Sequence, residues 1–393
     1  MMIMKAQKDI LNEHENKIET NTKKLLVPDF RKSIVNISAT LAEFLGAPNQ
    51  NPTLPILKEE LCKGYQNIVF LCFDGMGVYP LRKNLDETDF LFQNLRQTLF
   101  STFPSTTTNA TTSLLTNQLP LEHGWFGWSM HFAALHQNVD VYLGRDSATH
   151  EAVDFSDYPL GMADYYFDHA NGDYSINTVF PPYIHVTYPQ RNRFFQTAEE
   201  FWSAIEESCR KSGKQFVYAY YPELDSIMHK YGVTSPEARC SIQEISCKLK
   251  TLHESMADTL FIVSADHGQI DVSGYVNLYE DEVLLNLLEI YPFMEGRAPA
   301  FLVKKGREQV FEQYFQDKYG EDFILFKSSE LVTKGYFGNR GDKADFLGDY
   351  LAVGTYTHKQ ALLTPNTTRF KGHHTSLTEE MEVPLILLGK RLP

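Results

Sequence analysis

TLFIVSADHG, residues 259–268, contains an apolar run that ends at an acid and an imidazole, Asp266 and His267. An apolar run of this length between polar residues is typical of a buried strand in a parallel sheet. In open α/β sheets, ligands bind beyond the carboxyl ends of the strands. An Asp-His pair at the end of such a strand is therefore in the expected place for chemistry.

Two other apolar segments end in the same way. NIVFLCFDG, residues 67–75, ends with Asp74 and Gly75, and QFVYAYYPELD, residues 215–225, ends at Asp225. His229 follows Asp225 by four positions, so the two side chains share one face if the segment is helical. Taken alone, Asp74 is equally well explained as a helix cap, and the pair at 225 and 229 as a surface pair without metal.

A fourth segment, GHHTSLTEEMEVPLILLG, carries His373 and His374 and then the last apolar strand. Together the four segments supply enough carboxylates and imidazoles for two metal ions. Mixed Asp and His ligands suit Zn²⁺ or Mn²⁺ better than Mg²⁺, which favours oxygen and water. Two such ions roughly 3.5–4 Å apart can activate a nucleophile and stabilise a leaving oxygen in displacement at phosphorus.

Hydroxyl side chains are concentrated in TFPSTTTNATT, residues 102–112. Pro104 interrupts a β-like segment, and residues 105–108 fall at an expected helix start. Helix N-termini favour anions, so a hydroxyl there is placed to face a phosphoryl group. Capping of the helix by Ser and Thr explains the same pattern without any function.

Composition limits the class of protein. With 393 residues, the chain is long enough for one large α/β domain with an insertion, or for two domains. The net charge of −14 argues against binding to a nucleic-acid polymer, which requires a basic face. No run approaches the roughly 18 apolar residues of a membrane span, so no membrane association is expected. Five cysteines without a C-x-x-C pair favour a reduced, cytoplasmic setting.

Three regions are expected along the chain. Residues 1–26 are rich in charge and predict a solvated N-terminal arm. Residues 27–275 and 357–393 predict one catalytic domain, in which residues 146–196 form loops and short elements over the site. Residues 276–356 change pattern and predict a smaller α+β insertion, either a cap that selects the substrate or a structural lobe.

The order of these motifs resembles the alkaline phosphatase superfamily, and within it the type I phosphodiesterase/nucleotide pyrophosphatase family. The motifs are the strand into DG, TFPSTTTNATT, LPLEHG, PELDSIMHKYG, SADHG and GHHTSLTEEMEVPLIL, and the likeness runs from about residue 66 to 390. The resemblance implies an α/β fold with a mostly parallel sheet flanked by helices and a smaller inserted cap. It also implies two divalent metal ions, zinc first and manganese as the alternative.

The resemblance assigns the ligands by position. One metal would be held by Asp74, Asp266 and His267 together with the nucleophile, and the other by Asp225, His229 and a late histidine.

The late histidine and the nucleophile each have an alternative. The family's G-x-H-x-x-L-T pattern selects His374, with His373 as the alternative. Counting back from the segment before His123 selects Thr107 as the nucleophile, with Thr106 as the runner-up.

The implied activity is hydrolysis of phosphodiester or pyrophosphate bonds in a small phosphate ester or nucleotide-like substrate, through a phosphothreonine. Nucleotide-cleaving relatives use an Asn shortly after the His-Gly pair, where this chain has Trp128, and Asn109 is a candidate substitute. A phosphomonoesterase or phosphonate hydrolase is the alternative, although no Arg or Lys lies near the motifs in sequence. A non-catalytic metal-binding recognition protein is the other alternative, and the oligomeric state is left open.

Overall fold

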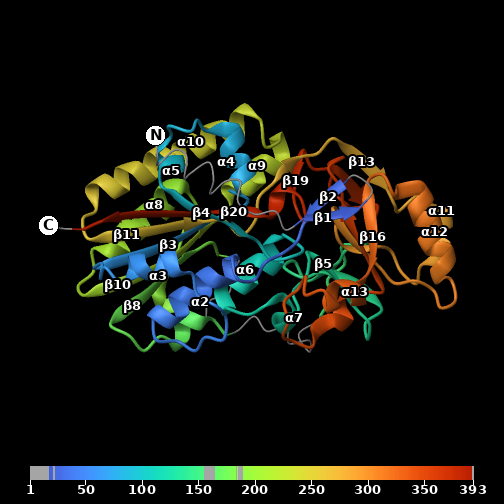
Figure 1. Ribbon diagram of the computed structural model, residues 1–393, viewed down its shortest axis with the longest axis horizontal. Helices are drawn as coiled ribbons and strands as arrows, with labels where there is room; N and C mark the ends of the chain where they lie inside the picture. The colour runs from blue at the N-terminus through green and yellow to red at the C-terminus, as the bar shows by residue number, and fades with distance from the viewer. Residues whose placement is uncertain (1–16, 21–22, 155–163, 183, 185–188, 392–393) are drawn as a thin grey trace.

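Two seven-stranded sheets organise the chain and lie side by side along its longest dimension (Figure 1). The computed structural model describes residues 17–20, 23–154, 164–182, 184 and 189–391. Most of the predicted N-terminal arm lies outside these residues; its described part is a hairpin of β1 (Lys17–Thr20) and β2 (Lys23–Leu26).

The first sheet is the predicted, mostly parallel one. Only β20 runs against the others. In order, its strands are β4 (Leu95–Phe100), β20 (Glu382–Lys390), β11 (Thr259–Ser264), β3 (Asn67–Phe73), β10 (Lys214–Tyr221), β8 (Tyr174–Phe180) and β9 (Asn192–Phe194). All seven residues of β3 and all six of β11 are buried, as expected for strands covered on both faces.

The register of the central strands brings their carboxyl ends together. Phe73, the last residue of β3, pairs with Tyr221, the last residue of β10. Ser264, the last residue of β11, pairs with Cys72. The residues that follow these three strands therefore emerge at one edge of the sheet.

Helices cover both faces of this sheet (Figure 1). One group consists of α4 (Val78–Asn84), α5 (Phe90–Gln93), α9 (Glu223–Tyr231) and α10 (Pro236–Ser255). The opposite group consists of α2 (Ile34–Phe44), α3 (Pro55–Leu61) and α6 (Thr107–Thr116). The predicted helix after Thr197 is α8 (Ala198–Cys209), which Thr197 begins by accepting a hydrogen bond from the N–H of Glu200.

The second sheet is antiparallel throughout. In order, its strands are β16 (Phe323–Lys327), β17 (Tyr350–Gly354), β15 (Ala298–Phe301), β14 (Phe293–Glu295), β5 (Ser129–Phe132), β6 (Gln137–Asp140) and β7 (Arg145–Asp146). Four strands come from the predicted insertion 276–356 and three from residues 129–146. The insertion also contributes α11 (Glu282–Leu287), α12 (Glu308–Tyr319) and α13 (Ser328–Thr333).

Short elements join the two sheets. They are α7 (Pro120–His123), the pair β12 (Ile270–Asp271) and β19 (Gly372–His373), and the pair β13 (Gly274–Asn277) and β18 (Lys359–Leu362). Single 3₁₀ turns occur at Tyr166–His169, Pro189–Arg191, Lys343–Leu347 and Glu379–Met381. Because β12 pairs with β19, the start of the fourth segment, which carries His373 and His374, is held beside the residues that follow β11.

Residues 146–196 depart from the prediction of loops and short elements. They contribute β8 and β9 to the first sheet, with β8 paired to β10 over six positions. The polar start of β8 hides it in the sequence, since Ser175 and Asn177 interrupt its apolar positions. Residues 155–163, 183 and 185–188 of this region lie outside the described part of the chain.

A buried ion pair fastens the second sheet to the loop that follows β19. The Nε of Arg297 donates to Glu380 Oε1 over 2.8 Å, and both side chains are fully buried. The backbone N–H of Arg297 also donates to the hydroxyl of Thr375, over 3.2 Å. This junction fixes the loop in which His374 lies.

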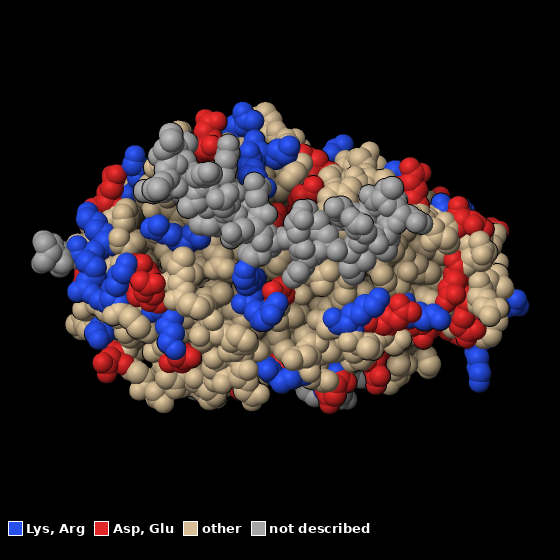
Figure 2. All heavy atoms as spheres, viewed as in Figure 1, with Lys and Arg blue, Asp and Glu red and all other residues tan. Residues whose placement is uncertain are grey.

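The surface carries charges of both signs. On the face in Figure 2, basic and acidic side chains are scattered among each other, between broad areas of uncharged residues. That mixture fits the overall acidity of the chain and is unlike the basic face of a polyanion-binding protein. Within the described residues, no helix is long and apolar enough to cross a membrane.

Candidate metal centre and substrate pocket

Three of the predicted ligands form a first group at the carboxyl edge of the first sheet. Asp74 follows β3, whereas Asp266 and His267 follow β11. The Nε2 atom of His267 lies 3.3 Å from Asp74 Oδ1 and 3.5 Å from Asp266 Oδ2. All three side chains are buried, and their ligand atoms lie within 4.8 Å of one another.

In each carboxylate of this group, one oxygen accepts hydrogen bonds, and the other has no hydrogen-bond partner among the described residues. Asp266 Oδ1 accepts from the backbone N–H groups of Gly75, over 3.2 Å, and His267, over 2.9 Å. The hydroxyl of Tyr220 donates to Asp74 Oδ2. Among the described residues, the buried Asp74 Oδ1 and Asp266 Oδ2 accept no hydrogen bond. Because unpaired buried carboxylate oxygens are costly, this arrangement fits a cation between them.

The remaining predicted ligands form a second group beside the first. Asp225 and His229 lie one turn apart on α9, with Asp225 Oδ2 3.2 Å from His229 Nε2. His374 follows β19, and its Nε2 is 4.0 Å from Asp225 Oδ1. The amide of Gln269 donates to the same Asp225 oxygen and so fixes the carboxylate.

Three histidines share one arrangement that sets their tautomer. The Nδ1 atoms of His229, His267 and His374 lie 2.8, 3.0 and 2.9 Å from the backbone carbonyls of Gly372, Gly268 and Ser105. A carbonyl only accepts, so each Nδ1 carries a proton, and in the neutral ring each Nε2 keeps its lone pair. Metal-binding histidines commonly have their other nitrogen held in this way.

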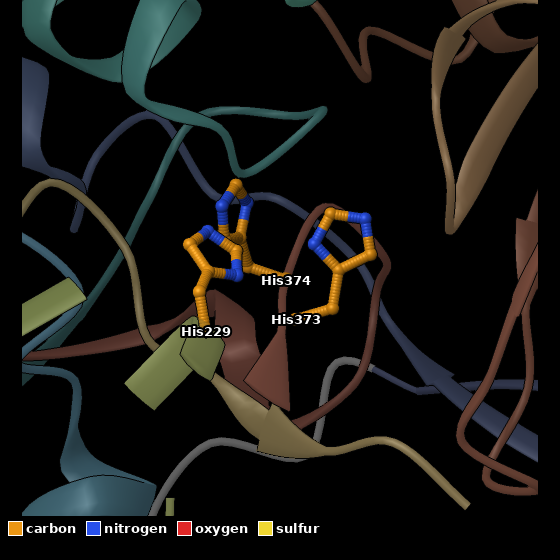
Figure 3. A group of neighbouring side chains, drawn as sticks. All are labelled: His229, His373 and His374. Atoms are coloured by element: carbon orange, nitrogen blue, oxygen red, sulfur yellow. The ribbon is translucent and has the colours of Figure 1, made fainter. Parts of the chain in front are cut away.

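His373 differs from these three. Its Nδ1 is buried without a hydrogen-bond partner among the described residues. Figure 3 shows the rings of His229, from α9, and His374 overlapping in this view, with the ring of His373 beside them. The ring centroid of His373 lies 5.0 Å from that of His374, about as close as the centroid of His229, at 5.2 Å. His373 nevertheless forms a possible ligand group with those two, whereas His374 belongs both to that group and to one with Asp225 and His267. The geometry therefore favours His374, the predicted ligand, over its alternative.

Burial and mutual repulsion shape the protonation of the site. Burial, with the nearby carboxylates of Asp225 and Asp266, raises the pKa of Asp74 well above its usual value. Burial likewise lowers the pKa of His374 well below its usual value, which leaves the ring neutral and able to bind a metal. Burial opposes ionisation of Asp225, yet the adjacent His229 lowers the pKa of Asp225 to about 2.

The hydroxyl cluster meets this centre at the start of α6. Thr107 is the first residue of the helix, and its Oγ1 lies 3.2 Å from His267 Nε2. Thr106 precedes the helix, is buried, and donates its hydroxyl to Glu295 Oε1 over 2.6 Å. Thr107 therefore faces the first ligand group, whereas the hydroxyl of Thr106 is engaged with the second sheet.

A pocket of about 280 Å³ opens over Thr107 and the second ligand group. Its walls come from the second sheet and from the loops and helices at the carboxyl edge of the first sheet, and include Trp128, Glu295 and Phe370. Trp128 stands where nucleotide-cleaving relatives carry Asn, and its backbone N–H donates to Glu295 over 2.8 Å. Asn109, the candidate substitute, is fully buried, donates to the carbonyl of Pro104, and is absent from the pocket walls formed by the described residues.

Sequence reasoning missed four residues of the site: Tyr220, Gln269, Glu295 and Arg145. Tyr220 lies on β10, which pairs with β3. Its contact with Asp74, 146 positions away in the chain, therefore depends on the register of two distant strands. Glu295 and Arg145 arrive through the second sheet. Arg145 is a cation that lines the pocket, although it lies outside the motifs in the sequence.

A sequence model described as type I phosphodiesterase / nucleotide pyrophosphatase matches residues 68–376. The chain belongs to this family. Its members are metal-dependent phosphoric ester hydrolases, which agrees with the ligand groups at the sheet edge. No curated protein sequence matches the chain significantly.

Several solved structures resemble this chain in fold. Human ectonucleotide pyrophosphatase/phosphodiesterase 5 is 16% identical, with a TM-score of 0.63 over 82% of this chain and 87% of that one. An inactive variant of the murine protein in complex with AMP is 17% identical, with a TM-score of 0.59 over 82% and 87%. Phosphonoacetate hydrolase from Sinorhizobium meliloti, in complex with phosphonoformate, is 15% identical, with a TM-score of 0.59 over 97% and 94%.

Proposed function

We propose that this family member hydrolyses phosphodiester or pyrophosphate bonds of small substrates through a phosphothreonine intermediate on Thr107. The observation that carries the proposal is the position of Thr107 at the start of α6, with Oγ1 3.2 Å from His267 Nε2 and beside the first ligand group. A threonine-to-alanine variant of the murine relative is described as inactive, which supports a threonine in this role.

The proposed ligand sets follow the two groups at the sheet edge. Asp74, Asp266, His267 and Thr107 would hold one divalent ion, and Asp225, His229 and His374 the other. The unpaired buried oxygens of Asp74 and Asp266 and the lone pairs on the three Nε2 atoms make this donor set suitable for zinc, with manganese as the alternative. When bound, such ions lower the pKa of a coordinated hydroxyl or water and offset negative charge on phosphoryl oxygens.

The chain itself binds and orients the substrate. The free N–H groups at the start of α6, a ten-residue helix, face the place where Thr107 meets the substrate and favour phosphoryl oxygens there. The side chains of Trp128 and Phe370 form the walls of the pocket beside the ligand groups. They shield the reacting group from water, which strengthens the electrostatic interactions around it.

The reaction divides into two displacements at phosphorus. In the first, Thr107 Oγ1 bonds to phosphorus while the bond to the leaving oxygen breaks, and the leaving group takes up a proton. In the second, water attacks the phosphothreonine, the bond to Oγ1 breaks, and the threonine hydroxyl is restored. Covalent catalysis of this kind replaces one hard step by two easier ones.

Cellular setting and domain roles are part of the proposal. We propose a cytoplasmic setting, supported by five cysteines that all have free thiols. We also propose that residues 276–356 act as a cap over a catalytic domain of residues 27–275 and 357–393. Their strand β14 supplies Glu295 and Met294 to the pocket, which supports a role in substrate choice.

A phosphonate hydrolase or phosphomonoesterase is the second candidate, and Arg145 in the pocket favours it. A substrate of either kind carries more negative charge in total than a diester, and a cation in the pocket offsets charge on the part of the substrate that it faces. The fold likeness to phosphonoacetate hydrolase is compatible with it.

The test compares bis(p-nitrophenyl) phosphate with p-nitrophenyl phosphate, using Zn²⁺- or Mn²⁺-loaded protein. We expect faster cleavage of the diester and loss of turnover in Thr107→Ala. Thr107→Ser is the matched control, because it keeps a hydroxyl at the same position and should retain part of the activity. Faster cleavage of the monoester would replace the proposal by the second candidate. No cleavage of either compound would contradict the phosphodiesterase and the phosphomonoesterase, and would leave a phosphonate hydrolase or a non-catalytic metal-binding protein.

A further inference from the structure

The pocket has a second end, away from the ligand groups, that the proposed reaction does not use. Met294 of β14 pairs with Ser129 of β5, Ser129 with Asp140 of β6, and Asp140 with Arg145 of β7. Residues that pair directly across a sheet point to the same face. All four indeed line the pocket, so they form one row across its floor.

The row sets how far Arg145 lies from the reacting group. Glu295, the neighbour of Met294, contacts Thr106, so β14 marks the end of the pocket where Thr107 lies. Arg145 is three strands further along the row, which is roughly 14 Å at about 4.8 Å per strand. An extended arginine side chain covers only part of that distance. Arg145 therefore faces a part of the substrate remote from the scissile phosphorus.

An ion pair with Asp140 orients the guanidinium of Arg145 through its Nε and does not use its terminal N–H donors. Its Nε donates to Asp140 Oδ2 over 3.1 Å. Among the described residues, Asp140 is the one side-chain partner of Arg145. A guanidinium has five N–H donors in a fixed plane, so one edge held by a carboxylate leaves the terminal nitrogens available for a second planar anion.

Hydrogen bonds hold the pocket wall around Arg145 in place. Asp146 Oδ1 accepts from the N–H groups of Ala148, over 2.9 Å, and Thr149, over 2.8 Å, which closes the turn after β7. The hydroxyl of Thr364 donates to the carbonyl of Ser147 over 3.2 Å, and the amide of Asn366 donates to that of Ala148 over 2.6 Å.

These bonds join the turn to the loop between β18 and β19, which leads to the histidine ligands. The same wall carries further hydrogen-bonding groups, namely His150, Ser147, Thr364, Asn366 and Thr367. Arginine, imidazole, amide and hydroxyl groups together are typical of a site for carboxylate or phosphate.

We propose that Arg145 forms an anion subsite, so that the preferred substrates carry a second anionic group several atoms from the scissile phosphorus. This inference rests on the proposed function for the identity of the reacting group, and it deepens that function by naming the substrate class. The second anion is a carboxylate or a phosphoryl group, which share the planar or tripodal oxygens that a guanidinium binds in pairs.

The test measures binding by calorimetry to the full-length, Zn²⁺-loaded protein, without turnover. The probes are matched pairs: 4-phosphonobutyrate against butylphosphonate, and 6-phosphonohexanoate against hexylphosphonate. Butane-1,4-diphosphonate is the phosphoryl arm, and phosphonoacetate is the short probe. In the wild type, we expect the second anion to tighten binding about tenfold at one of the two lengths, which is about 1.4 kcal/mol.

Arg145→Gln should remove most of this advantage, and Arg145→Lys should restore part of it. Arg210→Gln is the matched control, because Arg210 also pairs with an acid, Glu206, over 2.8 Å, but directly follows α8, outside the pocket. Phosphonoacetate should gain little from Arg145, since its two anions are too close together to reach both ends.

Three results would overturn the inference: equal affinity within each matched pair, an advantage that survives Arg145→Gln, or an equal dependence of phosphonoacetate on Arg145. Hydrolysis of bis(p-nitrophenyl) phosphate is measured on the same preparations. Loss of that hydrolysis in the wild type, with Arg145-dependent binding intact, would contradict the proposed reaction and leave the subsite standing. Hydrolysis without Arg145-dependent binding would contradict the subsite and leave the proposed reaction standing.

Discussion

The ring of His374 stacks on the ring of His267, with the centroids 3.9 Å apart and the planes 26° from parallel. His267 follows β11 and belongs to the first ligand group, whereas His374 follows β19 and belongs to the second. The stack therefore joins the two groups directly. It also restricts the ring of His374 to one orientation, in addition to the hydrogen bond from its Nδ1 to Ser105.

His374→Ala should cost more bound metal than His373→Ala. His374 directs its Nε2 toward Asp225 and supports His267, while the Nδ1 of His373 has no hydrogen-bond partner among the described residues to hold its ring. Elemental analysis of the purified variants after loading with Zn²⁺ should give close to two ions per chain for the wild type and about one for His374→Ala. Equal loss in both variants, or greater loss in His373→Ala, would reverse the assignment.

The two adjacent threonines should respond differently to removal of their hydroxyl groups. Thr107→Ala should lower kcat by at least about a thousandfold, because it removes the proposed nucleophile. Thr106→Val should retain turnover but lower the free energy of unfolding by about 1–3 kcal/mol, because Glu295 loses a buried hydrogen bond. Single-turnover kinetics and denaturant unfolding separate the two effects. If Thr106→Val abolishes turnover while Thr107→Ala does not, Thr106 is the nucleophile.

Tyr220→Phe should weaken metal binding without disturbing the fold. The hydroxyl donates to Asp74 Oδ2 and leaves Oδ1 directed at the ligand group. Removing a group that orients a ligand typically costs about 10–100-fold in metal affinity. Competition with a chromogenic chelator measures the affinity for Zn²⁺.

Tyr221→Phe is the control for this experiment. Tyr221 follows Tyr220 on the same strand, so its side chain lies on the other face of the sheet, where its ring packs on Phe201 at 4.8 Å. Its loss of a hydroxyl should leave the affinity for Zn²⁺ as in the wild type. An equal loss of affinity in both variants would mean that Tyr220 acts through the strand rather than through Asp74.

The core of the first sheet could be predicted because parallel strands buried on both faces are apolar throughout. β3 and β10 appear in the sequence almost to the residue, and their register explains why Asp74 and Asp225 meet. β8 was missed because Asn177 lies in its middle. That amide is buried and donates to Gln215 Oε1 over 3.0 Å, a partner that only the folded chain supplies.

The pocket could be predicted only in part, because half of it depends on pairing between distant segments. Met294 and Ser129 meet across β14 and β5, and no local pattern in either segment indicates the other. Glu295 and Arg145 enter the site through this pairing. Motif spacing identifies the residues at the ends of the parallel strands, whereas the substrate-facing wall requires the structure.

Asp281 should make the stability of the insertion, residues 276–356, depend on pH. It caps α11 by accepting from Val283 and Leu284, and it also accepts from the side chains of Lys318 and Tyr319 of α12. Burial opposes its ionisation, but the hydrogen bonds from Lys318 and Tyr319 lower the pKa of Asp281 to about 2. The folded state therefore holds the ionised form more strongly than the unfolded chain does, whose Asp titrates near pH ~3.9.

Its contribution should be fully present above about pH 4 and should decline as the pH falls toward about 2, because protonation then costs the folded state its ionised acceptor. Asp281→Asn should lower the free energy of unfolding by about 2 kcal/mol at pH 7, through loss of the charged acceptor of several donors. The difference in free energy of unfolding between the variant and the wild type should be smaller at pH 3. Urea unfolding of metal-free protein at both pH values measures it, with Asp317→Asn, an exposed residue of α12, as the control. If the difference in free energy of unfolding stays constant between pH 7 and pH 3, Asp281 stabilises the insertion by its shape and its capping of α11 alone, without its charge.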